Sequence, residues 1–162
     1  SLLLLPAVSL LTGCSALADD SAKTKSLAAA DITPVEMSDA EWREKLTPMA
    51  YYVMREAGTE RPFSSPLLQE KRAGTFVCAG CDLPLFDAAT KFKSGTGWPS
   101  FWDPIAEGHV LNRRDLSFGM PQTENVCARC GGHLGHVFED GPRPTGLRYC
   151  MNGAALKFVP KQ

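Results

Sequence analysis

The stretch Thr75-Phe76-Val77-Cys78-Ala79-Gly80-Cys81-Asp82-Leu83-Pro84-Leu85-Phe86 places a C-x-x-C motif between two short apolar runs. Short apolar runs punctuated by Gly and Pro are typical of antiparallel strands joined by turns. Similar runs continue toward the end of the chain, at His109-Val110-Leu111, Val137-Phe138 and Leu156-Lys157-Phe158-Val159. The sequence therefore predicts a mainly β domain.

A second C-x-x-C motif, Cys127-Ala128-Arg129-Cys130, lies well downstream of the first. Two thiolates on each of two tight turns can complete a tetrahedral sulfur site, which structural zinc prefers. Two disulfides or a dithiol redox pair are the alternatives, and a zinc module could also bind protein or nucleic acid. We expect one structural zinc held by Cys78, Cys81, Cys127 and Cys130. Such a closed site leaves no position for substrate.

Two short helices are predicted ahead of the strands. Ser38-Asp39-Ala40-Glu41 is a capping box, and Trp42 and Leu46 lie four residues apart on one helical face. Thr47-Pro48 begins the next helix, with Thr as the cap and Pro in the first turn, and Gly58 is its expected stop.

The N-terminal residues carry the pattern of an export signal. The apolar stretch from Leu2 to Leu11 is too short to span a bilayer, and Leu11-Thr12-Gly13-Cys14 resembles a bacterial lipoprotein box. We expect residues 1–13 to be a signal whose first residues lie upstream, and 14–37 to be a lipidated Cys14 with a flexible tether. Residues 38–162 then form the folded domain of an exported lipoprotein, anchored at a membrane and facing the periplasm or cell exterior. The alternative is a buried apolar element with an incidental cysteine.

Composition narrows the possible partners. The 162 residues carry a formal net charge of −1, with acidic and basic residues interspersed. Domains that bind nucleic acid are usually basic, and this chain is not, so we expect no nucleic-acid partner. Membrane contact is expected through the lipid anchor only.

Cys150 remains once the zinc ligands and Cys14 are set aside. Arg148 lies two residues before it and Asn152 two residues after it, so on a strand the three side chains share a face. A nearby cation favours the thiolate, which is the nucleophilic form of cysteine. An inert, buried cysteine is the alternative interpretation.

Two histidines, His133 and His136, lie upstream of this thiol and could move protons near neutral pH. Their spacing puts them on opposite faces of a regular strand, so both could serve one site only if Gly135 bends the chain. One of them could instead replace a cysteine as a zinc ligand.

Trp98 lies in Ser94-Gly95-Thr96-Gly97-Trp98-Pro99-Ser100-Phe101. A Gly-rich turn that presents Trp and then Pro forms a rigid aromatic wall, suited to a methyl-thioether group. Trp98 could equally cap the core.

From about Leu46 to Lys161 the chain resembles the B-type methionine sulfoxide reductases. The resemblance rests on both C-x-x-C motifs, on the Trp98 stretch, and on Gly58-Thr59-Glu60-Arg61-Pro62-Phe63, His133 to Phe138 and Asp140 to Cys150. It implies two antiparallel sheets with short N-terminal helices and a zinc away from the catalytic face.

The resemblance also implies roles for the candidate residues. Cys150 would attack the sulfur of methionine-R-sulfoxide, free or in oxidised proteins, and become a sulfenic acid. Trp98 would contact the substrate methyl group. The sulfoxide oxygen would be bound, polarised or protonated by His133, His136, Arg148 and Asn152. A catalytically silent zinc-stabilised binding module and a thiol-disulfide oxidoreductase are the rival functions.

One departure concerns recycling. Many members of that family carry a second, resolving cysteine within the stretch that matches Lys93 to Thr96, and this chain has none there. We therefore expect an external thiol, either a thioredoxin-like protein or a small thiol, to reset the enzyme.

Overall fold

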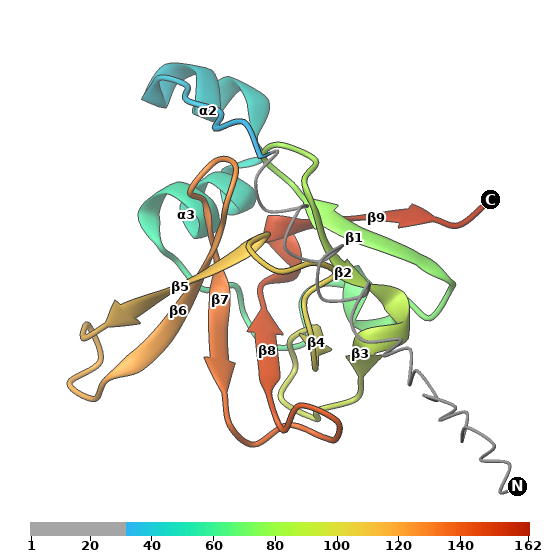
Figure 1. Cartoon of the computed structure of the whole chain (residues 1–162). Coiled ribbons are helices and arrows are strands. Elements are labelled where there is room, and N and C mark those ends of the chain that lie inside the picture. Colours follow the sequence, from blue (N-terminus) through green and yellow to red (C-terminus); the bar gives the residue numbers. More distant parts are fainter. Residues whose placement is uncertain (1–31) are drawn as a thin grey trace, which may run out of the picture.

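The computed structural model describes residues 32–162 (Figure 1). The expected signal (1–13), Cys14 and most of the expected tether (14–37) lie outside these residues. In residues 32–162 no helix combines the length and apolar character needed to cross a membrane.

Two capped helices begin the described chain. Helix α2 spans Asp39–Lys45, and both halves of the predicted capping box between Ser38 and Glu41 are present. Helix α3 spans Pro48–Glu56, and the Thr47 side chain accepts a hydrogen bond from the backbone of Ala50. The left-handed residue that ends α3 is Ala57, not the expected Gly58. Gly58 instead makes room for the Tyr52 ring, since a Cβ there would lie 2.3 Å from a ring carbon.

The remaining chain forms two antiparallel sheets, as the family resemblance implied. The smaller has the order β2-β1-β9, with β1 at Gly74–Cys78, β2 at Pro84–Asp87 and β9 at Leu156–Pro160. The larger has the order β3-β4-β8-β7-β6-β5. Its strands are β3 (Lys91–Phe92), β4 (Ser100–Phe101), β5 (Val110–Asp115), β6 (Gln122–Cys127), β7 (His133–Phe138) and β8 (Arg148–Met151). Short 3-10 turns lie at Pro66–Gln69, Ala88–Thr90 and Gly153–Ala155.

An aromatic cluster joins the two sheets. Phe101 of the larger sheet stacks on Phe86 of the smaller, with ring centroids 4.3 Å apart, and meets Phe76 edge-on at 4.9 Å. All three side chains are fully buried. Such pairs contribute about 0.5–1.5 kcal/mol each beyond the area that they bury. Helix α3 packs on β7 and on the Gly153–Ala155 turn, so the core lies between the sheets and under this helix.

The register of the larger sheet places one row of side chains on the face opposite the core. Ser100 and His136 lie on either side of Cys150, and Glu124 lies beyond His136. The neighbours of Cys150 along β8, Tyr149 and Met151, point the other way into the core. The sheet therefore presents Cys150 between two strands, away from the apolar interior.

Candidate active site

A bulge in β7 puts both histidines on one face. Gly135 pairs with Asn125 and His133 with Val126, so Leu134 has no partner residue on β6. The extra residue reverses the alternation of side chains, and the rings of His133 and His136 lie 5.4 Å apart. The bend that the sequence analysis required at Gly135 therefore occurs, with Leu134 as the unpaired residue.

The bulge is held from outside the strand by Asn152. Its backbone N–H and its side-chain amide both donate to the Leu134 carbonyl, at 2.9 and 3.1 Å. Its side-chain oxygen accepts a hydrogen bond from the backbone of Glu60 at 2.9 Å. Asn152 thus supports the shape of β7 as well as facing the site.

Glu60 joins three parts of the site, and sequence reasoning did not single it out. Its buried carboxylate accepts hydrogen bonds from the backbone N–H groups of Gly153 and Ala154, at 2.6 and 2.9 Å. Its carbonyl accepts one from the Trp98 indole at 3.1 Å. Only its place in the stretch 58–63 marked it in the sequence, because its partners lie 38 to 94 residues away.

Each histidine is paired with a carboxylate from the hairpin of β5 and β6. His133 Nδ1 lies 2.7 Å from Glu124 and His136 Nε2 lies 2.8 Å from Asp115. The hydroxyl and backbone N–H of Ser117, and then His136, lower the pKa of Asp115, which therefore stays ionised. Burial lowers the pKa of His133, although Glu124 opposes the shift. A proton on Nδ1 satisfies Glu124 and leaves Nε2, which has no partner among the described residues, as an acceptor.

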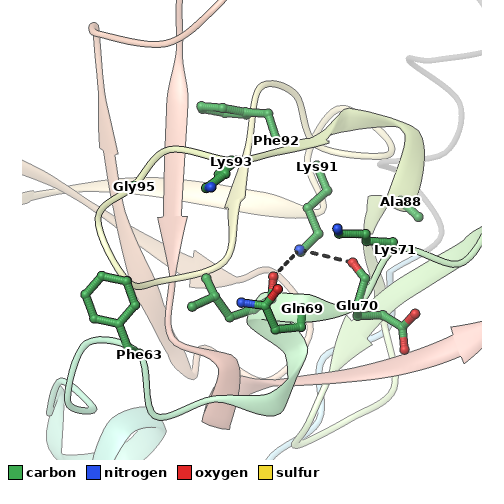
Figure 2. A pocket seen from close by; sticks show the side chains of 11 residues that line it. Phe63, Gln69, Glu70, Lys71, Ala88, Lys91, Phe92, Lys93 and Gly95 are labelled. Atoms are coloured by element: carbon green, nitrogen blue, oxygen red, sulfur yellow. Dashed lines mark hydrogen bonds between the residues drawn. The ribbon is translucent and has the colours of Figure 1, made fainter.

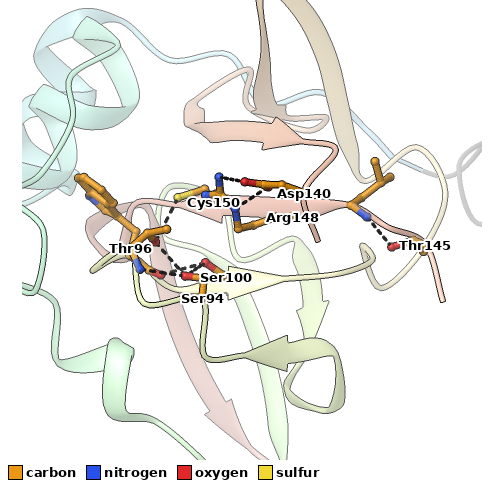
Figure 3. Close-up of polar contacts among 9 residues, drawn as sticks. Ser94, Thr96, Ser100, Asp140, Thr145, Arg148 and Cys150 are labelled. Carbon is orange, nitrogen blue, oxygen red and sulfur yellow. Dashed lines mark hydrogen bonds and ion pairs between the residues drawn. The ribbon is translucent and has the colours of Figure 1, made fainter. Parts of the chain in front are cut away.

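Cys150 rests as a protonated thiol. Burial raises the pKa of Cys150, and this outweighs the Thr96 hydroxyl and the Arg148 guanidinium, which favour the thiolate. Arg148 is committed to Asp140 through two hydrogen bonds of 2.8 and 2.9 Å (Figure 3). The expected effect of Arg148 is therefore present in direction but too weak to ionise Cys150 by itself.

Hydroxyl groups occupy the turn in which the sequence analysis looked for a second, resolving cysteine. Thr96 Oγ1 lies 3.9 Å from Cys150 Sγ and 2.8 Å from the Ser94 hydroxyl, to which Ser100 donates at 2.8 Å (Figure 3). No cysteine shares this position among residues 32–162, in agreement with the sequence analysis.

These elements surround a cavity of about 340 Å³. Of the predicted residues, four line the cavity directly, namely Cys150, His136, Asn152 and Trp98. His133 lies beside His136, and Arg148 lies two residues before Cys150 on β8. Gly135, which the sequence analysis named only as a bend, also lines the cavity. The sequence analysis assigned no role to the other lining residues, which are Thr59, Phe118, Gln122 and Phe138. Aromatic walls around a thiol, an imidazole and an amide suit a small substrate with an apolar end and a polar oxygen.

A separate cavity of about 390 Å³ is lined in part by Gly95 and Gly97, which belong to the turn that carries Thr96 (Figure 2). It contains none of the predicted site residues. Lys91 donates there to the carbonyls of Leu68 and Glu70, at 2.9 and 3.1 Å, and its burial lowers its pKa. This ammonium group serves to tie the Pro66–Gln69 turn to β3.

The four cysteines of the two motifs form one cluster. The sulfurs of Cys78 and Cys130 lie 3.6 Å apart, those of Cys81 and Cys127 3.5 Å, and all four lie within 4.8 Å of one another. Disulfide sulfurs would lie about 2 Å apart, whereas ligands of tetrahedral zinc lie about 3.8 Å apart. The donors fit a metal of that kind, and neither His133 nor His136 belongs to the cluster.

Both cysteine turns have the same backbone geometry. The carbonyls of Cys78 and Cys127 accept hydrogen bonds from Asp82 and Gly131, at 2.9 and 2.8 Å. Asp82 and Gly131 both adopt left-handed conformations, with φ of 59° and 67°. The first turn follows β1 of the smaller sheet and the second follows β6 of the larger, so the cluster links the two sheets.

Comparison with known proteins agrees with this geometry. The SelR domain family matches residues 46–160. The peptide methionine sulfoxide reductase MsrB of Bradyrhizobium diazoefficiens is 59% identical over 124 residues, which is 76% of this chain and 89% of that protein. The MsrB proteins of Agrobacterium fabrum and Leptospira interrogans are 56% and 53% identical, over 78% and 76% of this chain and 93% and 95% of theirs.

The raised pKa of Cys150 predicts slow alkylation at neutral pH. An unperturbed thiol is half ionised at about pH 8.5, so the rate of iodoacetamide labelling at Cys150 should still be rising above that pH. Arg148→Met removes a cation that lowers this pKa and should move the profile to higher pH. Mass spectrometry of the Cys150 peptide measures both. A midpoint below pH 8.5 that is the same in the wild type and in Arg148→Met would contradict a raised pKa of Cys150 and an effect of Arg148 on it.

Proposed function

Because this chain belongs to the SelR domain family of B-type methionine sulfoxide reductases, we propose that the cavity beside Cys150 is its active site. The protein reduces methionine-R-sulfoxide to methionine. The observation that carries the site assignment is the convergence of Cys150, His136, Asn152 and Trp98 on one cavity from three separate segments.

The reaction moves one oxygen atom from substrate to enzyme. Cys150 sulfur attacks the sulfoxide sulfur and forms an S–S bond. The protonated sulfoxide oxygen then transfers to the Cys150 sulfur as the S–O and S–S bonds break, which yields methionine and the sulfenic acid of Cys150. The sulfoxide is thereby reduced by two electrons and Cys150 is oxidised by two. The departing oxygen needs a proton, and a neutral Cys150 thiol brings one into the site.

We assign the proton transfer to the histidine pair. His136 lines the cavity, and its carboxylate partner Asp115 stabilises the imidazolium that forms when it accepts the thiol proton. His133 is neutral because burial lowers its pKa, and its ring lies beside that of His136, so we assign the two histidines to the proton transfer together. Arg148 stabilises the thiolate as it develops, and Asn152 faces the sulfoxide oxygen. Trp98 and Phe138 provide the wall for the methyl-thioether end.

Turnover of each epimer tests this function against a silent zinc-stabilised module. With dithiothreitol as reductant, the wild type should reduce the R epimer of N-acetyl-methionine sulfoxide and leave the S epimer nearly untouched. Cys150→Ser should abolish turnover, because the hydroxyl is a poor nucleophile at neutral pH. His136→Asn should slow it by about 10²–10⁴-fold. Equal activity on both epimers, or full activity in Cys150→Ser, would overturn the proposal.

Zinc is the metal that we propose for the thiol cluster, held by Cys78, Cys81, Cys127 and Cys130. Bound there, it acts as a cross-link between the sheets, and no catalytic step passes through it. Metal analysis should find one zinc per chain. Cys81→Ser should lose the metal and unfold at a markedly lower temperature, because metal binding contributes directly to folding. Cys150→Ser is the matched control and should keep both. A folded, active protein without zinc would contradict this.

Recycling is proposed to depend on an external thiol, from a thioredoxin-like protein or a small molecule. The hydroxyl of Thr96 lies 3.9 Å from Cys150 but cannot form a disulfide. After one equivalent of substrate without reductant, a sulfenic-acid probe should label Cys150 in the wild type. Thr96→Cys should replace that label with an internal disulfide, whereas Thr96→Ser should keep it. An internal disulfide in the wild type would show that another cysteine resolves the intermediate.

Export as a lipoprotein is proposed from Leu11-Thr12-Gly13-Cys14 alone, with residues 38–162 as the reductase domain. The precursor made in a bacterial host should yield a membrane-associated protein that begins at a lipid-modified Cys14. Cys14→Ser should abolish this modification and leave turnover unchanged, because the catalytic residues all lie within the domain. Fractionation and mass spectrometry of the N-terminal peptide decide the question. An unmodified Cys14 thiol on processed protein would count against it.

A further inference from the structure

Apolar side chains gather at the tip of the β5–β6 hairpin. Leu116, Phe118 and Met120 are 60%, 64% and 72% exposed, although five residues contain all three. The hairpin projects from the body of the protein, and its tip lies far from the core between the sheets (Figure 1). Apolar groups that are concentrated at an exposed tip, and are not scattered singly, mark an interaction site. The tip, Leu116 to Pro121, carries no charged side chain.

This tip continues into the wall of the active-site cavity. Phe118 lines the cavity together with Gln122, and its ring meets the His136 ring edge-on with centroids 6.1 Å apart. Asp115, which pairs with His136, immediately precedes the tip. A ligand whose reacting group lies beside Cys150 therefore has Phe118 next to it, with Leu116 and Met120 farther out.

A methionine sulfoxide side chain fills only the cavity itself, and the residues on either side of it in a polypeptide must lie outside. Apolar neighbours would remove part of the exposed surface of Leu116 and Met120 from water, which is favourable in proportion to the area covered. Methionine in a folded protein is mostly buried and could not reach the cavity beside Cys150. The surface therefore suits an extended, unfolded segment.

We propose that Leu116, Phe118 and Met120 form a docking surface for the apolar residues that flank methionine-R-sulfoxide in unfolded protein segments. This inference rests on the proposed function and names the substrate class of the same site. A lipid surface is the competing partner for an apolar tip flanked by Arg113 and Arg114. Polypeptide is favoured because Phe118 belongs to the cavity wall, and a bilayer over the tip would cover the mouth of the site.

The test measures turnover of three substrates by the full-length enzyme. They are N-acetyl-methionine-R-sulfoxide, a peptide with Leu and Phe beside the sulfoxide, and a peptide with Gly and Ser there. The double variant Leu116→Ser, Met120→Ser should lower kcat/KM for the apolar peptide by about 10-fold, mainly through KM. Turnover of the other two substrates should stay within about 2-fold of the wild type. A second double variant, Leu116→Met with Met120→Leu, should retain the wild-type kcat/KM for the apolar peptide, because it keeps the apolar surface.

The matched control is Val159→Ser, which removes a half-exposed apolar side chain from the smaller sheet and should change none of the three rates. Equal losses on all three substrates, or no loss on the apolar peptide, would overturn the inference while the reductase function stands. Failure of the wild type on the small substrate would instead remove the proposed function. Vesicle binding is measured by cosedimentation with equal parts phosphatidylethanolamine and phosphatidylglycerol. If the double variant loses the vesicle binding of the wild type while its peptide turnover is unchanged, the tip binds lipid and the inference is overturned.

Discussion

The close pairing of β7 with β8 at Gly135 is the constraint on which the site depends. A Cβ at Gly135 would lie 2.0 Å from the Cys150 carbonyl oxygen, so only glycine permits the two backbones to pair here. This pairing puts His136 directly opposite Cys150, with Ser100 on the other flank. Cys150 and the proposed proton-transfer residue His136 are thus positioned by backbone hydrogen bonds, which define side-chain placement more rigidly than a surface loop would.

Two features outside the strands maintain that pairing. Asn152 holds the carbonyl of the bulged Leu134 and is itself held by Glu60, whose carbonyl also orients Trp98. The carboxylate of Glu60 is buried, and the backbone N–H groups of Gly153 and Ala154 stabilise it. At the same end of β7, Cys130 precedes His133 by only three residues, so a metal held by the thiol cluster would fix where this strand begins.

The electrostatic balance at Cys150 favours a neutral resting state. Burial is the largest influence on its pKa, and Arg148 shares its charge with Asp140. The thiolate is the form that reacts with oxidants and electrophiles, so a protonated Cys150 reacts slowly with them. Under the proposed mechanism, His136 with its carboxylate partner Asp115 accepts the thiol proton when Cys150 reacts.

The sequence by itself determined the parts of the structure that depend on neighbouring residues. The Ser38–Glu41 and Thr47 caps, the short strands and the two cysteine turns follow from local hydrogen bonds and from the alternation of apolar residues. The choice of Cys150 follows because the other cysteines have assigned roles. The alternation alone, however, put His133 and His136 on opposite faces, because it assumes a regular strand.

Only the tertiary structure decided how those parts meet. The bulge at Leu134 that joins the histidines depends on Asn152, 18 residues away, and the role of Glu60 depends on contacts across 92 residues. Phe118 and Thr59 line the site because the hairpin tip and the chain before Phe63 reach the cavity beside Cys150. The net effect of Arg148 on Cys150 required the burial of the thiol and the position of Asp140. Burial and long-range pairing are properties of the packed chain, and no short stretch of sequence contains them.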